Sequence, residues 1–114
     1  MLYLNFTFFS GMLSKGEVKI LKKDLTLKEA RDLILRNKVK VCANLLHRET
    51  FEVFKKRYKI EIEIPLKPIK VILKKGDELI VAQIVNFPRL SGNYQYEKSL
   101  LEKAEIDFLL IKII

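Results

Sequence analysis

The stretch that decides the fold is residues 79–85, which read LIVAQIV. If this stretch is extended, the residues that point to either side of the chain are apolar, and Gln83 is the one exception. A strand with this pattern is covered on both faces, whereas a strand at a solvated face alternates between apolar and polar residues. We therefore place residues 79–85 at the centre of a β-sheet.

The residues before this stretch predict two further strands. Residues 69–73 and 79–85 flank the sequence KKGD, which is typical of a turn and predicts a β-hairpin. Residues 59–64 alternate strictly between isoleucine and glutamate after Lys59, which predicts a half-buried strand. Pro65 and Pro68 follow and are expected to end that strand.

The two ends of the chain also predict strands. Residues 2–9 are rich in aromatic and apolar side chains, and residues 106–114 form a nearly continuous apolar run. Shorter strands are expected at residues 17–21 and 39–43. The sheet is therefore expected to draw on both halves of the sequence.

Helices are predicted between these strands. The sequence TLKE at 26–29 has the spacing of a capping box, and the helix that follows should end near Asn37. A second helix is expected at about residues 45–58, with Asn44 as its N-cap, and a weaker one at 96–104 after a loop at 86–93. The predicted fold class is α/β: one domain, residues 1–114, with a single mixed sheet of about five strands and flanking helices.

Composition excludes several classes of protein. The chain has 114 residues, 49% of them hydrophobic, so it is not disordered, and it has no apolar run of the roughly 20 residues that span a bilayer. Its one cysteine, Cys42, and one histidine exclude an internal disulfide and a zinc site with several cysteines. Residues 1–14 carry no lysine or arginine, so we expect a folded strand there and not a signal peptide, in a protein of the cytoplasm.

The charge points to anionic partners. The net charge is +8 and the isoelectric point is about 9.6. Such an excess favours nucleic acid, nucleotides or an acidic surface as partners, but a lysine-rich surface without a ligand gives the same composition. Abundant lysine, glutamate and isoleucine with no tryptophan also favour a thermophilic source.

The candidate site residues are few. If Asn44 caps the second helix, His47 lies in the first turn, where free backbone N–H groups favour binding of a phosphate. A histidine beside that phosphate could donate a proton to a leaving oxygen. Alternatively, His47 continues the packing face of Phe51, Phe54 and Tyr58. Arg89 falls in the loop after the central strand and could clamp a phosphate, or it is a solvated charge.

Weaker candidates surround these two. Lys67 and Lys70 could add to a basic site or lie on the surface, and Ser10 and Gly11 could position a ligand or form a simple turn. The opening aromatic residues could stack on bases, but core packing is the better explanation for most of them, and Cys42 fits a small buried side chain. No phosphate loop, dinucleotide fingerprint, nucleophile elbow, HExxH motif or RNA-recognition signature occurs.

Four segments together resemble the viral anti-CRISPR ring nucleases and their CRISPR-associated relatives. The first is the opening strand that runs into Met12-Leu13, and the second is the run of small residues from Cys42 that leads to His47 before a helix. The third is the Gly76-Asp77 turn with the strand after it, and the fourth is Arg89-Leu90. Length and element order are similar from end to end.

The resemblance implies a metal-independent enzyme without cofactors. Members are homodimers that bind cyclic tetra-adenylate, the second messenger of type III CRISPR defence, and cut it to linear di-adenylate with a cyclic phosphate end. The family's general acid would correspond to His47 and its ligand-binding arginine to Arg89. The resemblance implies no membrane association, and a viral protein of this kind would act in the host cytoplasm.

Several positions depart from the family pattern. Leu46 stands where the family has glycine, Ser91-Gly92 replaces the acidic residues after the Arg-Leu pair, and Phe6 and Phe9 occupy the family's Asn and Ser positions. Besides the enzyme, two readings therefore stay open. One is a non-catalytic protein that sequesters a cyclic nucleotide or binds nucleic acid, and the other is an interaction protein with a lysine-rich surface.

Overall fold

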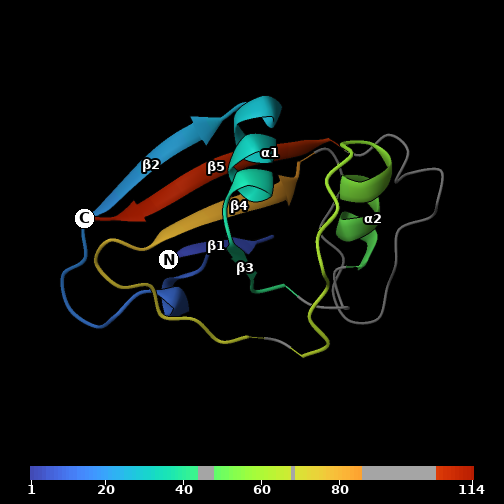
Figure 1. The fold of residues 1–114 in the computed structure, drawn as a ribbon. Helices are drawn as coiled ribbons and strands as arrows, with labels where there is room; N and C mark the ends of the chain where they lie inside the picture. The colour runs from blue at the N-terminus through green and yellow to red at the C-terminus, as the bar shows by residue number, and fades with distance from the viewer. Residues whose placement is uncertain (44–47, 68, 86–104) are drawn as a thin grey trace.

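The computed structural model describes residues 1–43, 48–67, 69–85 and 105–114. In them, a five-stranded sheet has the spatial order β2-β5-β4-β1-β3 (Figure 1). The strands are β1 (Leu2–Asn5), β2 (Ile20–Leu25), β3 (Val39–Val41), β4 (Glu78–Ile84) and β5 (Ile106–Ile113). β1 runs parallel to β3 and β4, whereas β5 runs antiparallel to β4 and β2. The predicted single mixed α/β sheet is thus confirmed, and β4 lies in its middle.

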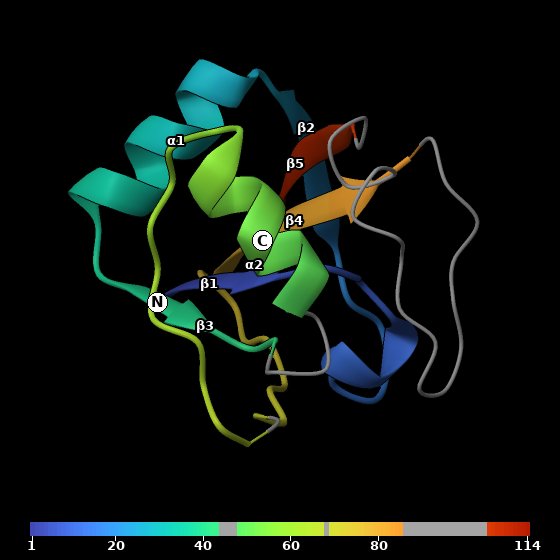
Figure 2. The same ribbon diagram turned by 90° about the vertical axis from the view of Figure 1, so that its right-hand side faces the viewer.

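Two helices cover one face of this sheet (Figures 1 and 2). α1 (Leu27–Arg36) begins with the predicted capping box: Thr26 Oγ1 accepts from Glu29 N–H at 3.1 Å, and Glu29 Oε1 accepts from Thr26 N–H at 3.1 Å. α2 (Arg48–Lys56) matches the described part of the second predicted helix. Residues 44–47, including the predicted Asn44 cap, lie outside the described residues.

The helices and the sheet enclose the larger core. Phe6 packs edge-on against Phe51 and Phe54, with ring centroids 4.8 and 5.4 Å apart, and Phe54 lies 5.8 Å from Phe108 of β5. Ala30 and Ile34 bring α1 onto the same cluster, together with Leu4, Ile80, Ala82 and Ile106 of the strands. Burial of these side chains holds both helices to one face of the sheet.

A second, smaller core covers the other face. The short 3-10 helix η1 (Ser10–Met12) places Met12 against the sheet, beside Leu73 and the strand residues Leu79, Val81, Ile111 and Ile113. Leu73 N–H donates to Met12 O at 2.7 Å, and an isolated parallel bridge joins Leu13 to Leu73. η1 and the segment around Leu73 therefore cover this face of the sheet, as the two described helices cover the opposite face.

The first strand is shorter than predicted. β1 ends at Asn5, where the Asn5 Oδ1 atom accepts from Phe6 N–H at 2.9 Å and diverts that donor from a strand partner. After this point Phe6 enters the helix-side core, Phe8 packs on the opposite face, and Phe9 is 54% exposed. Core packing of most of the opening aromatic residues is thus confirmed, and Phe9 is the exception.

The predicted hairpin is wrong, although its turn is real. Asp77 N–H donates to Lys74 O at 2.8 Å, Lys74 N–H donates to Asp77 Oδ2 at 2.9 Å, and Gly76 supplies the positive φ of 91°. Residues 69–73 nevertheless form no strand. Both edges of β4 are occupied, one by β1 and the other by β5, so no edge is left for a hairpin partner.

The strand predicted at residues 59–64 is also wrong. Its alternation of burial is present, with Ile60 fully buried, Ile62 and Ile64 partly buried, and the two glutamates exposed. Lys59 turns the chain out of α2 with φ 56°, and Ile60 N–H donates to Phe54 O at 2.8 Å. The extended segment then runs past the edge of the sheet without joining a strand ladder.

The remaining predictions are mixed. β5 confirms the strand expected at 106–114, and β3 confirms a shorter version of the one expected at 39–43. β2 lies a few residues later than the strand expected at 17–21. The loop at 86–93 lies outside the described residues, as does the helix at 96–104. In the described residues, no helix is long and apolar enough to cross a membrane.

Candidate functional site

Three parallel strands end at one edge of the sheet. β1, β3 and β4 run in the same direction, so their carboxyl ends lie on one side of the sheet, which faces the viewer in Figure 2. In open α/β sheets, ligands bind in the crevice outside the carboxyl ends of the strands. The predicted site residues come from the segments that follow these strands: Ser10 and Gly11 after β1, Asn44 and His47 after β3, and Arg89 after β4.

Of these residues, the structure describes Ser10 and Gly11. Both are exposed and belong to η1, which Leu13 N–H closes by donating to Ser10 O at 3.0 Å. A Cβ atom at position 11 would lie 3.0 Å from the Phe9 ring, so a larger residue needs that ring to move. The turn predicted here is confirmed, and it presents an exposed hydroxyl and backbone at this edge.

A further polar residue lies beside η1, and the sequence did not reveal it. Asn5, the last residue of β1, is 8% exposed. Its Oδ1 accepts from Phe6 N–H, while its Nδ2 lies 4.0 Å from Met12 Sδ, a weak acceptor. In the described residues no stronger acceptor engages this amide nitrogen, so the donor of Asn5 is only weakly satisfied. The only signal in the sequence was a polar residue inside an apolar run.

The two candidate lysines lie on the connection between α2 and β4. Lys67 and Lys70 are both exposed, and neither forms an ion pair with a described residue. The hydrogen bond from Leu73 N–H to Met12 O joins the end of this connection to η1. The segments that carry Lys70, Ser10 and Gly11 therefore meet. Both lysines also adjoin a groove along β3, because Leu66 and Ile69 line it.

The three remaining candidates, Asn44, His47 and Arg89, lie outside the described residues. The described helix α2 begins at Arg48, directly after His47 in the sequence. Phe51 and Phe54, which share its predicted stripe, are 5% and 0% exposed and belong to the helix-side core. Both readings of His47, general acid and packing residue, stay open.

The cysteine that follows β3 is not a nucleophile. Burial raises the pKa of the Cys42 thiol to about 11, against which the nearby Lys40 charge acts only weakly. The reactive form of cysteine is the thiolate, and at neutral pH this group stays protonated. Cys42 is 6% exposed and serves as a small buried side chain, as predicted.

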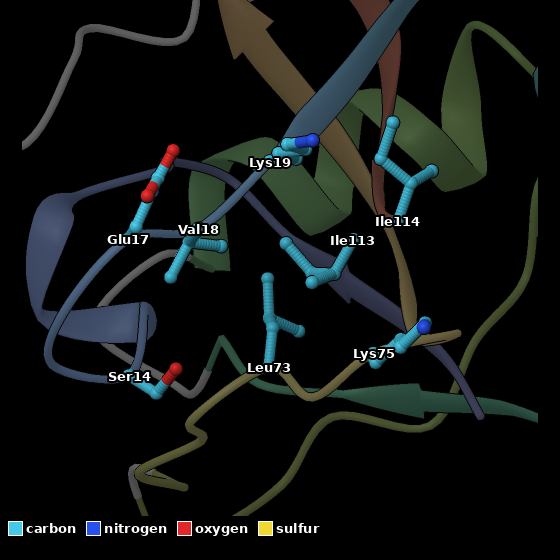
Figure 3. Close-up of a pocket in the computed structure, with 8 residues that line it drawn as sticks. All are labelled: Ser14, Glu17, Val18, Lys19, Leu73, Lys75, Ile113 and Ile114. Atoms are coloured by element: carbon cyan, nitrogen blue, oxygen red, sulfur yellow. The ribbon is translucent and has the colours of Figure 1, made fainter.

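A cleft of about 440 Å³ lies at the opposite edge of the sheet, beside the end of β5 (Figure 3). Val18, Leu73 and Ile113 point toward its centre, and Lys19 and Lys75 lie at its rim. None of the predicted site residues that the structure describes lines it. In the parts of the chain that the structure describes, no three His, Cys, Asp or Glu side chains are grouped as a metal site.

In the described residues, the fold defines a small α/β protein: a five-stranded mixed sheet with two helices on one face and three parallel strands that end on one side. Among solved structures, the chain is similar to B116 of Sulfolobus turreted icosahedral virus, with a TM-score of 0.69 over 97% of both chains. The two sequences are 16% identical, so the likeness shows a shared fold. No family model and no curated protein matches the chain.

Proposed function

We propose that this protein is a ring nuclease that cleaves cyclic tetra-adenylate without a metal ion. The observation that carries the proposal is the meeting of β1, β3 and β4 at one edge of the sheet. The segments that follow these strands contain the residues that the ring-nuclease resemblance assigns to the ligand. A fold shared with a Sulfolobus virus protein fits a viral member that acts against type III CRISPR defence in the host cytoplasm.

The proposed chemistry needs a proton donor and donors to phosphate. A ribose 2′-hydroxyl attacks the adjacent phosphorus, the bond to the 5′ oxygen breaks, and a 2′,3′-cyclic phosphate forms. His47 gives a proton to the departing 5′ oxygen, a role worth about 10²- to 10⁴-fold in rate. Arg89, with Lys67 or Lys70, offsets the charge that develops on the phosphate oxygens.

The residues around η1 position the ring. Ser10 offers its hydroxyl and Gly11 its backbone, and Asn44 would orient the backbone N–H groups at the start of α2. The described Asn5 adds the amide donor beside Met12. Two such sites related by a two-fold axis fit a ring of four equivalent nucleotides, which is why we propose a homodimer.

The first experiment incubates the purified protein with cyclic tetra-adenylate in EDTA at high temperature and separates the products by chromatography. We expect linear di-adenylate with cyclic phosphate ends. His47→Ala should bind the ring as wild type does but cleave it at least ~100-fold more slowly. Equal rates for the variant and the wild type would remove His47 from the mechanism.

Recovery of intact cyclic tetra-adenylate after this incubation would contradict the proposed enzymatic activity. Tight, salt-tolerant binding of one ring per dimer would then show a sequestering protein. Because the net charge of +8 also favours nucleic acid, ordinary RNA and DNA are titrated in parallel. Binding of those that weakens steeply with salt would indicate a nucleic-acid-binding protein.

A further inference from the structure

A groove of about 560 Å³ runs along the outer side of β3, the edge strand next to β1. One wall is the edge of β3 with Ile34 of α1 above it, and the other is the extended segment that contains Ile62 and Ile64. Figure 2 shows this segment passing beside β3. We call this feature the β3 groove, and it lies apart from η1 and its neighbours.

The backbone of β3 presents unpaired groups to the groove. Leu4 pairs with Val41, and Cys42 N–H donates to Leu4 O at 2.8 Å. In a parallel pair with this register, Lys40 and Cys42 direct their backbone groups to β1, while Val39 and Val41 direct theirs outward. In the described residues, no backbone hydrogen bond joins Val39 or Val41 to the segment across the groove.

The two faces of the groove differ in chemistry. Val39 and Val41 belong to the face that packs on the helix-side core, and Ile34, Ile62 and Ile64 extend that apolar face across the groove. Lys38 and Lys40 alternate with the valines and therefore face the other side of the sheet. Glu63, between Ile62 and Ile64 on the opposite wall, is the acidic residue among the described lining residues, which also include both lysines. Neither lysine forms an ion pair with a described residue.

We propose that the β3 groove binds an extended segment of a partner protein as an additional strand of the sheet. Four outward groups, the N–H and C=O of Val39 and Val41, supply the main-chain bonds. The bound segment alternates between apolar residues, which meet the isoleucine side, and acidic residues, which meet Lys38 and Lys40. This is strand addition with charge complementarity as its source of selectivity.

A second copy of this chain fits the groove less well than an acidic segment does. If β3 paired with β3 of another copy, lysines of both strands would lie on one face of the sheet at close range. Like charges opposite each other on neighbouring strands are destabilising. Lysine on an edge strand also acts in natural proteins against pairing between identical edges.

The test uses two fluorescein-labelled eight-residue peptides and the full chain. One peptide alternates valine with glutamate, and the other alternates valine with lysine. We expect saturable binding of the glutamate peptide by fluorescence anisotropy and at least ~10-fold weaker binding of the lysine peptide. Equal affinities, or no binding of the glutamate peptide at millimolar concentration, would overturn the proposal.

Matched variants then separate backbone pairing from packing. Val41→Pro removes an outward donor, and Val41→Ala removes the same side chain but keeps that donor. The proline variant should bind the glutamate peptide at least ~10-fold more weakly than the alanine variant does. Identical affinities of these two variants would overturn strand addition.

A charge variant keeps the test independent of folding. Lys38→Glu with Lys40→Glu leaves the backbone and the apolar face intact, and it should reverse the preference from the glutamate peptide to the lysine peptide. An unchanged preference would contradict the proposal. Sedimentation of wild type and Val41→Pro shows whether a copy of this chain occupies the groove: a wild-type dimer lost in the proline variant overturns the acidic segment as the occupant.

Discussion

At the scale of single residues, Asn5 is the polar group whose position needs explanation. A buried amide without good partners costs roughly 1–3 kcal/mol, so such groups are usually satisfied. Asn5 Oδ1 is satisfied by Phe6 N–H, which also ends β1. Its Nδ2 is left with a sulfur atom at 4.0 Å. This weakly bonded N–H donor lies next to η1, which carries the exposed Ser10 and Gly11. For this reason we propose that it contacts the ligand.

We therefore predict separate effects on folding and binding when this amide is changed. Asn5→Ala removes the acceptor for Phe6 N–H and should lower the free energy of unfolding by about 1 kcal/mol. It should also weaken binding of cyclic tetra-adenylate by at least ~10-fold, since one hydrogen bond to a charged group contributes roughly 1.5–3 kcal/mol. Urea denaturation and isothermal titration measure the two effects.

The matched control is Asn37→Ala, at an exposed asparagine whose Nδ2 donates to Leu33 O at 2.8 Å at the end of α1. We expect this variant to bind the ring as wild type does. If Asn5→Ala changed stability alone, Asn5 would be a structural cap for β1 and not a ligand residue.

At the scale of elements, α1 shows what local sequence determines. Its capping box was predicted from four residues, and both reciprocal hydrogen bonds are present. Thr26→Ala should lower the free energy of unfolding by about 1 kcal/mol because it leaves Glu29 N–H without its acceptor. Thr26→Ser keeps the hydroxyl and should lose much less. Thermal and urea denaturation measure both, and equal losses would show that the hydroxyl does not act as the cap.

The same box predicts a dependence on pH. Hydrogen bonds from Thr26 lower the pKa of the Glu29 carboxyl below 4.5, and Lys23 at 3.5 Å contributes less. A carboxyl with a lowered pKa in the folded state adds stability above its unfolded pKa, and this stability is lost as the pH falls through the folded value. The difference in Tm between wild type and Glu29→Gln should therefore be present at pH 7 and vanish at strongly acidic pH. A difference that stays constant to pH 2 would contradict this assignment.

Strand pairing is the part of the fold that the sequence did not determine locally. The turn at Lys74–Asp77 formed as predicted because Gly76 and the Asp77 side chain specify it within four residues. Whether a hairpin follows depends on which strands compete for β4, and β1 and β5 come from opposite ends of the chain. The isoleucine alternation at 59–64 likewise predicted burial correctly, but burial of one face does not specify a hydrogen-bonded partner.

The candidate site, like the strands, was predicted from the sequence only in part. Residue type alone drew attention to Ser10 and Gly11, which lie in the predicted turn at the parallel strand ends. Lys67 was grouped with Lys70 from their spacing around Pro68, and both are exposed beside residues that line the β3 groove. The chain reaches η1 only at Leu73, after Lys70. Asn5 could not be found from the sequence, because the sequence does not show that β1 ends at this residue. Only the fold shows that this asparagine is the last residue of the strand.

At the scale of the whole molecule, the proposal requires two copies of the chain. One protomer contributes a single His47, and its three parallel strand ends form one open edge of a 13.4 kDa protein. A ring of four nucleotides with two cleaved bonds fits a two-fold axis that brings two such edges together. If a second copy completes the proposed site, the short exposed segments of one protomer do not have to enclose the ring alone.

Activity should therefore depend on protein concentration in a defined way. If the ring is held between two copies, cleavage falls in proportion to the dimer, and thus with the square of total protein once dilution separates the copies. Sedimentation velocity locates that concentration range, and the initial rate of cyclic tetra-adenylate cleavage is measured across it. A rate that stays proportional to total protein where the chain sediments as a monomer would show that one protomer holds a complete site. The two-fold arrangement would then be wrong, even if His47 and Arg89 kept their roles.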